Sequence, residues 1–201
     1  MIDSKKSIWA WSFYDWANSA FATTVMAGFF PVFFKEYWSN TDSVTLSTWY
    51  LGLANSIASI VVAVFAPFLG AIADRGTAKK KFLITFAFIG ILGTGALWMV
   101  KQGDWQLAVI LYIIGSIGYA AGNIFYDSLL PGVASKKKID YASSLGFSIG
   151  YIGGGYFFCS MFSCTNILKC LEYPTLQSPL EYPLCLWQCG GPYFQFQLSF
   201  L

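Results

Sequence analysis

The chain has 201 residues, of which 56% are hydrophobic and only 11% are charged, and its formal net charge is +2. Soluble domains carry about 25% charged residues, so this composition excludes an ordinary soluble domain. The chain has no histidine, and its five cysteines lack the repeated CxxC spacing of a zinc site. We therefore expect no metal and no cofactor.

Long apolar runs account for the composition. A bilayer core about 30 Å thick requires roughly 20 apolar residues of helix. Four runs approach or exceed that length, and a fifth begins near Tyr141 and reaches Phe158. The four are residues 11–34, 50–73, 82–100 and 105–130. The sequence therefore predicts an all-α membrane protein with about five transmembrane helices, and its main partner is expected to be the lipid bilayer.

The first run contains the polar stretch "YDWANS", residues 14–19. Asp15 and Asn18 lie three residues apart, so a helix brings them to one face. Asn123 and Asp127 lie one turn apart on the fourth run, which would be antiparallel to the first, and both aspartates follow Phe-Tyr. Because carboxylates inside a membrane by default mark pathways, we expect these four residues to form a substrate or proton pathway. Hydrated caps at helix ends are the alternative.

An intramembrane aspartyl protease would also use two buried carboxylates. The second motif of that family, Gly-x-Gly-Asp, is absent from this chain. We therefore expect that the protein is not an enzyme.

The loop between the second and third runs reads "GAIADRGTAKKK", residues 70–81. Gly70 would permit close helix approach, Asp74 is expected to cap the neighbouring helix end, and the basic residues would anchor the loop to anionic headgroups. The loop resembles the signature of the major facilitator superfamily, although Thr77 stands where that family usually has glycine. The residues that carry the resemblance are Gly70, Asp74, Arg75, Lys79 and Lys80. A basic stop-transfer loop without further meaning is the alternative.

Two further stretches narrow the resemblance. These are "WSFYDWANSAFATTVMAGFFPVFF" in the first run and "FYDSLLP", residues 125–131. They resemble the branch that contains the autophagy-related vacuolar amino-acid effluxers and their bacterial relatives, over about residues 8–158. The resemblance implies a twelve-helix permease for small solutes, amino acids among them. This chain would supply its amino-terminal part, and its partners would be a small-molecule solute and the missing carboxy-terminal half.

Glycines mark the fourth and fifth runs for close helix packing. Gly118 and Gly122 are four residues apart in the fourth run. In the fifth, "LGFSIGYIGGG" sets Gly146, Gly150 and Gly154 four apart on one helix face. That segment is similar to the antiporter signature on the fifth helix of facilitators, but helix packing is the simpler interpretation.

Basic residues are divided unevenly between the predicted loops. If the N-terminus is cytoplasmic, nine of the eleven lysines and arginines before residue 159 lie on the inner side, and only Lys35 and Lys101 lie outside. Such an asymmetry is the positive-inside signal. It predicts a multi-pass protein of a bacterial inner (plasma) membrane with a cytoplasmic N-terminus. The positions of the basic residues are then explained by the membrane topology, so we expect that the protein does not bind nucleic acid.

The composition changes after Phe158. All five cysteines and four of the seven prolines follow that residue. We predict two parts: residues 1–158, the amino-terminal transmembrane helices of a permease, and residues 159–201, an aberrant Cys/Pro-rich tail that is frameshifted or disordered. A genuine but irregular membrane-associated tail is the alternative. The chain is accordingly expected to be a truncated, inactive fragment, and a non-transporting remnant or a helix-packing membrane protein is the competing hypothesis.

Overall fold

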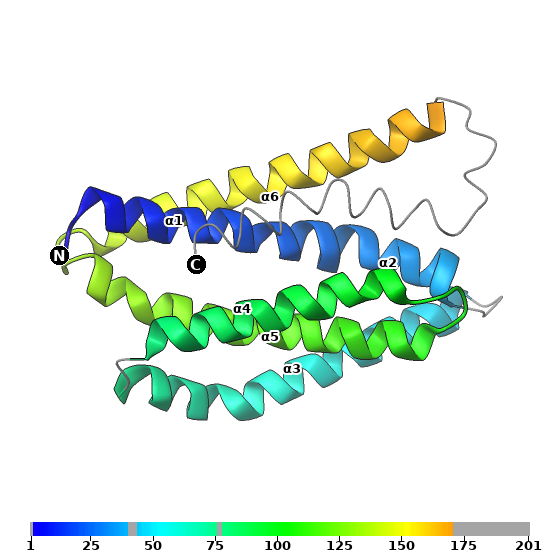
Figure 1. The fold of residues 1–201 in the computed structure, drawn as a ribbon, viewed down its shortest axis with the longest axis horizontal. Coiled ribbons are helices and arrows are strands. Elements are labelled where there is room, and N and C mark those ends of the chain that lie inside the picture. The colour runs from blue at the N-terminus through cyan, green and yellow to red at the C-terminus, as the bar shows by residue number, and fades with distance from the viewer. Residues whose placement is uncertain (1, 40–43, 76–77, 171–201) are drawn as a thin grey trace.

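The structure is a computed structural model that describes residues 2–39, 44–75 and 78–170. Within these ranges the chain is mostly helical and contains no strand. Figure 1 shows long helices that run side by side along the longest axis. Four described helical segments are long and apolar enough to cross a membrane, which confirms the predicted all-α membrane protein. They are Lys5–Trp38, Thr45–Asp74, Lys79–Met99 and Trp105–Val133.

The first of these segments is continuous but changes its helical winding. α1 (Lys5–Ala20) passes into a π-helix, η1 (Phe21–Phe29), then a short α2 (Phe30–Phe33) and a second π-helix, η2 (Phe34–Trp38). Pro31, which has no backbone N–H, lies between the two π-helices. π-Helical turns are rare and frequently occur at functional sites. Here they lie in the same continuous segment as Asp15 and Asn18 of the predicted pathway.

The remaining helices extend beyond the apolar runs that predicted them. They are α3 (Val44–Arg75), α4 (Lys79–Ala96) with a 3₁₀ turn η3 (Leu97–Met99), α5 (Trp105–Val133) and α6 (Ile139–Cys170). The sequence predicted that the fourth run ends before Pro131, but α5 includes this proline in its last turn. At that position the missing N–H of proline removes only one helical hydrogen bond. α6 continues past Phe158, and the rest of the predicted tail, 171–201, lies outside the described residues.

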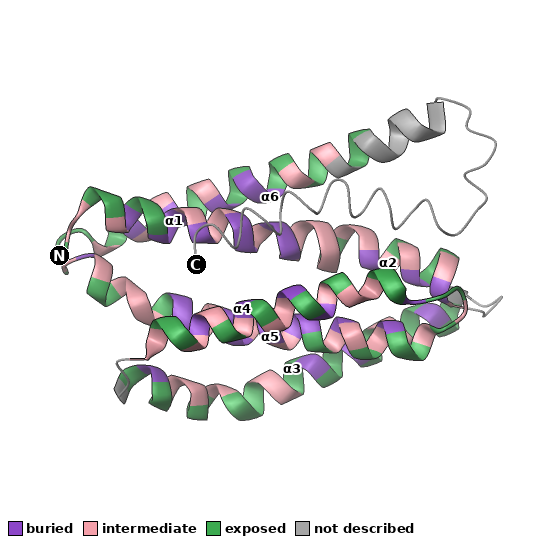
Figure 2. Cartoon of the chain, viewed as in Figure 1, coloured by how far each residue is buried: buried purple, intermediate pink, exposed green. Residues whose placement is uncertain are grey.

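α5 is the central helix of the bundle. α4 and α5 form the most extensive contact, followed by α1 with α6 and α3 with α5 (Figure 1). α3 carries much of the exposed surface in Figure 2, including Ile60 and Phe68. In a bilayer such an apolar face contacts lipid chains, so its exposure in the isolated chain is no defect of packing.

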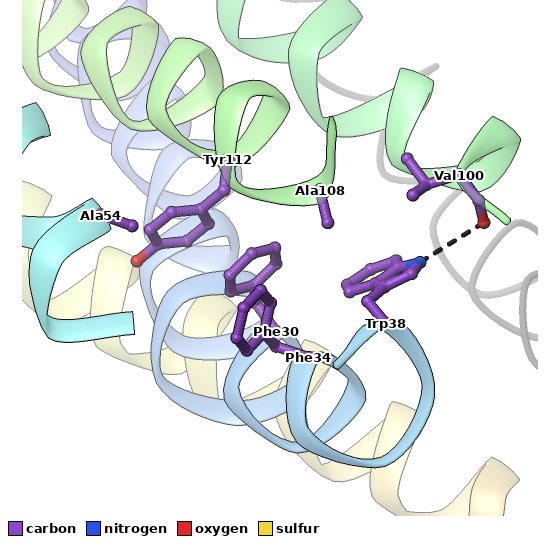
Figure 3. Close-up of a cluster of buried hydrophobic side chains, with 7 residues drawn as sticks. All are labelled: Phe30, Phe34, Trp38, Ala54, Val100, Ala108 and Tyr112. Atoms are coloured by element: carbon purple, nitrogen blue, oxygen red, sulfur yellow. Dashed lines mark hydrogen bonds between the residues drawn. The ribbon is translucent and has the colours of Figure 1, made fainter. Parts of the chain in front are cut away.

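Two aromatic clusters lie at opposite ends of the contact between the first helix and α5. One cluster contains Phe30 and Trp38 (Figure 3). Phe30 stacks on Tyr112 with ring centroids 4.0 Å apart. Nε1 of Trp38 donates a hydrogen bond to the carbonyl oxygen of Val100 at 3.4 Å. The other contains Trp11 and Tyr126. The polar residues predicted from the sequence lie along α1 and α5 at or beside the second cluster.

Candidate functional site

The two asparagines of the predicted pathway meet. Asn18 on α1 donates a hydrogen bond from Nδ2 to Oδ1 of Asn123 on α5. Asn18 is only 5% exposed, and Tyr119 lies one turn away from Asn123 on α5. Hydrogen bonds between membrane helices contribute about 0.6 kcal/mol on average and up to about 1.7 kcal/mol. The contact is therefore a specific link between α1 and α5.

Asp15 faces a different helix. A Cβ atom at Gly150 of α6 would collide with the Asp15 carboxylate and lie 2.8 Å from Oγ of Ser19. Residues three apart on a helix differ by about 60° in direction, which is enough for them to face two neighbouring helices. The structure thus differs from the expected single face, because Asn18 faces α5 while Asp15 lies against α6.

Asp127 is exposed, one turn beyond Asn123 on α5. Its charge nevertheless acts on Asp15, and both carboxylates act on the hydroxyl of Tyr126. Tyr126 is only 5% exposed, and within the described part of the chain its hydroxyl has no hydrogen-bond partner. Two carboxylates and a buried hydroxyl therefore share one electrostatic environment where α1 approaches α5 and α6.

An aromatic frame, which sequence reasoning missed, holds α1 against α5. Trp11 stacks on Tyr126 with centroids 4.4 Å apart, and its Nε1 donates to the Tyr126 carbonyl oxygen at 3.1 Å. Tyr14 stacks on the same ring at 5.1 Å. Trp11, Tyr14 and Asn18 follow the i, i+3, i+7 spacing of one helix face, so the pattern was present in the sequence.

A small cavity adjoins the asparagine pair. Its volume is about 20 Å³, and it lies between α1, α4 and α5. A cavity of this size holds about one water molecule when it offers two or more polar partners. Its polar lining side chains are Tyr14, Asn18, Thr94 and Tyr119.

The glycines predicted on the fourth run face two different neighbours. A Cβ at Gly118 would lie 2.7 Å from Cα of Gly90 and 2.8 Å from the carbonyl oxygen of Phe86, both on α4. Gly122 instead faces α1, where a Cβ would lie 3.6 Å from the Tyr14 hydroxyl. Of these two glycines, Gly118 is the one that lies at a backbone-to-backbone helix crossing.

The glycines of the fifth run lie along the contact between α6 and the first helix. A Cβ at Gly146 would meet the ring of Trp11, and one at Gly150 would meet Asp15. One at Gly154 would lie 2.9 Å from Cγ2 of Thr23. Three consecutive turns of α6 thus present glycine to the same neighbouring helix.

The loop residues Gly70, Asp74 and Arg75 lie at the end of α3. A Cβ at Gly70 would have nothing within 4 Å, so this glycine is not at a close helix contact in the described chain. Asp74 is exposed, and it does not cap the next helix: the N-cap of α4 is Ala78, without a side-chain capping bond. The expected cap is therefore wrong. α4 begins at Lys79, so its cap position falls four residues after Asp74.

Lys79 joins α4 to α5. Its Nζ donates to the carbonyl oxygen of Ser128 at 3.0 Å, within the last turns of α5 and beside Asp127. The adjacent Lys80 is exposed. Of the loop residues singled out in the sequence, Lys79 is the one that contacts the helix of the candidate site. Among the described residues, no cluster of three or more His, Cys, Asp or Glu could hold a metal ion.

Comparison with known proteins gives one family and several relatives. The family model described as vacuole effluxer Atg22 like matches residues 44–145. The MFS-type transporter YxiO of Bacillus subtilis, itself uncharacterized, is 37% identical over 145 residues, which cover 72% of this chain and 34% of that protein. Autophagy-related protein 22 of Coccidioides immitis is 26% identical over 172 residues, covering 64% of this chain and 28% of that protein.

An uncharacterized protein of Aquifex aeolicus is 27% identical over 144 residues, covering 72% of this chain and 35% of its own length. The chain thus spans about a third of the length of these relatives. No solved structure gives a significant match.

Proposed function

Because the chain belongs to the Atg22-like vacuole effluxer family of MFS-type transporters, we propose that it forms the amino-terminal part of a permease for small solutes. A permease of this class is built from two halves around a midplane site. The helices described here would pair with a carboxy-terminal half in that bundle. The protein is accordingly proposed to be a transporter and not an enzyme, in a bacterial plasma membrane.

The observation that carries the proposal is the polar contact between α1 and α5. Asn18 and Asn123 form a hydrogen bond inside helices that are otherwise apolar, and Asp15 and Asp127 lie close enough to interact electrostatically. Carboxylates within membrane helices are costly and almost always face a bundle interior or a water-filled cavity. Asn18 and Asn123 join where two spans meet, and the two carboxylates lie on the same two helices within a turn of them, so a solute or proton pathway is the function that these residues support best.

Amino acids are the solutes that this chemistry fits. A zwitterionic amino acid offers an ammonium group, which a carboxylate such as Asp15 attracts, and a carboxylate, which the amide N–H groups of Asn18 or Asn123 can bind. The family description, vacuole effluxer, and the name of the autophagy-related relative refer to those proteins and specify no solute. Asp127, which is exposed, would bind the ammonium group or a proton on its way to the pathway.

Transport in a full-length relative tests the proposal. The relative should contain both Phe-Tyr-Asp motifs and both asparagines, and it is reconstituted in proteoliposomes with labelled amino acids. With residues numbered as here, Asp15→Asn and Asp127→Asn should each reduce uptake at least tenfold while insertion stays intact. Asp104→Asn, an exposed carboxylate at the N-cap of α5, is the matched control and should transport normally.

Two outcomes would contradict parts of this account. Normal uptake in both variants would show that the carboxylates are hydrated helix ends, and uptake of other solutes alone would remove the amino-acid assignment. The present chain is assayed beside the relative. Uptake by the relative but not by this chain would favour a non-transporting membrane-inserted fragment.

A further inference from the structure

The N-terminal segment makes an unusual contact with a distant part of the chain. Asp3 has a left-handed backbone with φ 66°, a conformation that is strained for non-glycine residues, although Asp and Asn tolerate it best. Its backbone N–H donates to the carbonyl oxygen of Val133 at 3.0 Å, and its Oδ1 accepts from the backbone N–H of Ser135 at 2.9 Å. One residue therefore makes two hydrogen bonds to the junction between α5 and α6.

An apolar cluster lies beside these hydrogen bonds. Ile8 of α1, Ala134 of the junction and Ala142 of α6 are buried against one another. This small core thus joins α1 and α6 to the same junction that Asp3 contacts. Because backbone strain persists only where the surroundings over-determine it, the left-handed turn and this core indicate a defined junction and not a loose end.

Charges around Asp3 favour its ionised form. The hydrogen bond from the Ser135 backbone, then the Ser135 side chain and the positive charge of Lys138 lower the pKa of the Asp3 carboxyl below its usual value. Other charged groups of the adjoining segments are exposed. They are Lys5 and Lys6 at the start of α1, and Lys136, Lys137 and Asp140 at the junction.

The end of α5 is also held from its other side. Lys79 of α4 donates to the carbonyl oxygen of Ser128, about one turn before Val133 accepts from Asp3. The last turn between these two contacts contains Pro131, which lacks the N–H for a helical hydrogen bond. This part of α5 is therefore weakened within the helix and fixed by contacts from α1 and α4.

We propose that Asp3 is a latch residue, which closes this end of the bundle by tying the start of α1 to the junction of α5 and α6. Its release frees the first turns of α1 to move relative to α5. This positioning residue lies outside the membrane spans, and its role does not depend on which solute the protein transports.

Amide hydrogen exchange of the full chain in detergent micelles tests the latch. Asp3→Gly removes the carboxylate but keeps the N–H and relieves the left-handed strain, and Asp3→Asn keeps an oxygen acceptor without the charge. We expect Asp3→Gly to speed exchange at least tenfold in peptides covering residues 131–138 and also in those covering the first turns of α1. Asp3→Asn should give a smaller increase in both.

Asp140→Asn, an exposed acidic residue in the first turn of α6, is the charge control and should leave both peptides unchanged. Peptides of α4 serve as an internal standard for folding. If Asp3→Gly changes exchange less than twofold, or only at the junction and not in α1, the latch proposal fails. Because Asp3→Gly relieves strain, loss of the fold is not expected to obscure the result.

Discussion

At the scale of single residues, the polar side chains of this chain act in pairs between helices. Asn18 bonds to Asn123, and the Tyr112 hydroxyl donates to Oδ1 of Asn55 at 2.7 Å, which links α5 to α3. Outside the spans, Asp3 makes the corresponding contact between α1 and the junction beyond α5. Each pair helps to fix the position of a helix, because apolar surfaces alone give little specificity to helix packing within a membrane.

The Asp3 contact should depend on pH in one direction. Its pKa is lowered in the folded chain by the hydrogen bond from Ser135 and by Lys138, so the contact contributes stability above the unfolded pKa of about 3.9. That contribution is lost as the pH falls through the lowered value, because a protonated carboxyl accepts the bond less well. The amide proton resonance of Ser135 should shift in an NMR titration from pH 7 to pH 2, and Asp3→Asn should abolish the transition. A titration unaffected by Asp3→Asn would contradict the assignment.

At the scale of helices, glycine decides which pairs pack closely. Gly90 and Gly118 allow the backbones of α4 and α5 to touch, whereas Gly155 of α6 has nothing within 4 Å of a Cβ. The four-residue spacing of Gly146, Gly150 and Gly154 predicted their shared face on α6, and the structure places them against the first helix.

Gly118→Ala should destabilise the bundle. Its Cβ would meet backbone atoms of Gly90 and Phe86, which cannot rotate away, and overpacking of this kind costs about 1–3 kcal/mol. Gly155→Ala is the matched control and should be neutral or slightly stabilising, since alanine is a better helix former. The measurement is thermal unfolding in detergent micelles. Equal melting temperatures for the two variants would argue against the α4–α5 crossing.

At the scale of the whole molecule, the start of α1, the end of α3, the start of α4 and the α5–α6 junction lie at one end of the bundle (Figure 1). The lysines at this end are the ones that the sequence assigned to the cytoplasm. Cysteines introduced at the exposed Lys80 and Lys137, with native cysteines removed, should resist an impermeant thiol reagent in intact cells. A cysteine at the exposed Gln102, at the other end of α5, should be labelled. Labelling of Lys80→Cys or Lys137→Cys would reverse the proposed topology.

The sequence predicted the helices better than the direction of the side chains on them. A run of about 20 apolar residues satisfies its backbone hydrogen bonds within a membrane by forming a helix, and the five predicted runs are almost entirely helical in the structure. Side-chain direction depends on helix rotation, which packing sets, and this is why Asp15 faces α6 instead of sharing the face of Asn18. The π-helices around Pro31 and the left-handed Asp3 have no periodic signal. The left-handed Asp3 is held by contacts with residues distant in the chain, such as that with Ser135.

Whether the contact between α1 and α5 serves transport is tested most directly by a pair of matched variants. Asn18→Ala and Asn55→Ala each remove one interhelical side-chain hydrogen bond to α5, so similar losses of stability, about 0.6–1.7 kcal/mol, are expected. In the full-length relative, Asn18→Ala should reduce amino-acid uptake at least tenfold, and Asn55→Ala should retain more than half of it. Equal uptake by the two variants would show that the Asn18–Asn123 contact only joins helices, and would contradict the account.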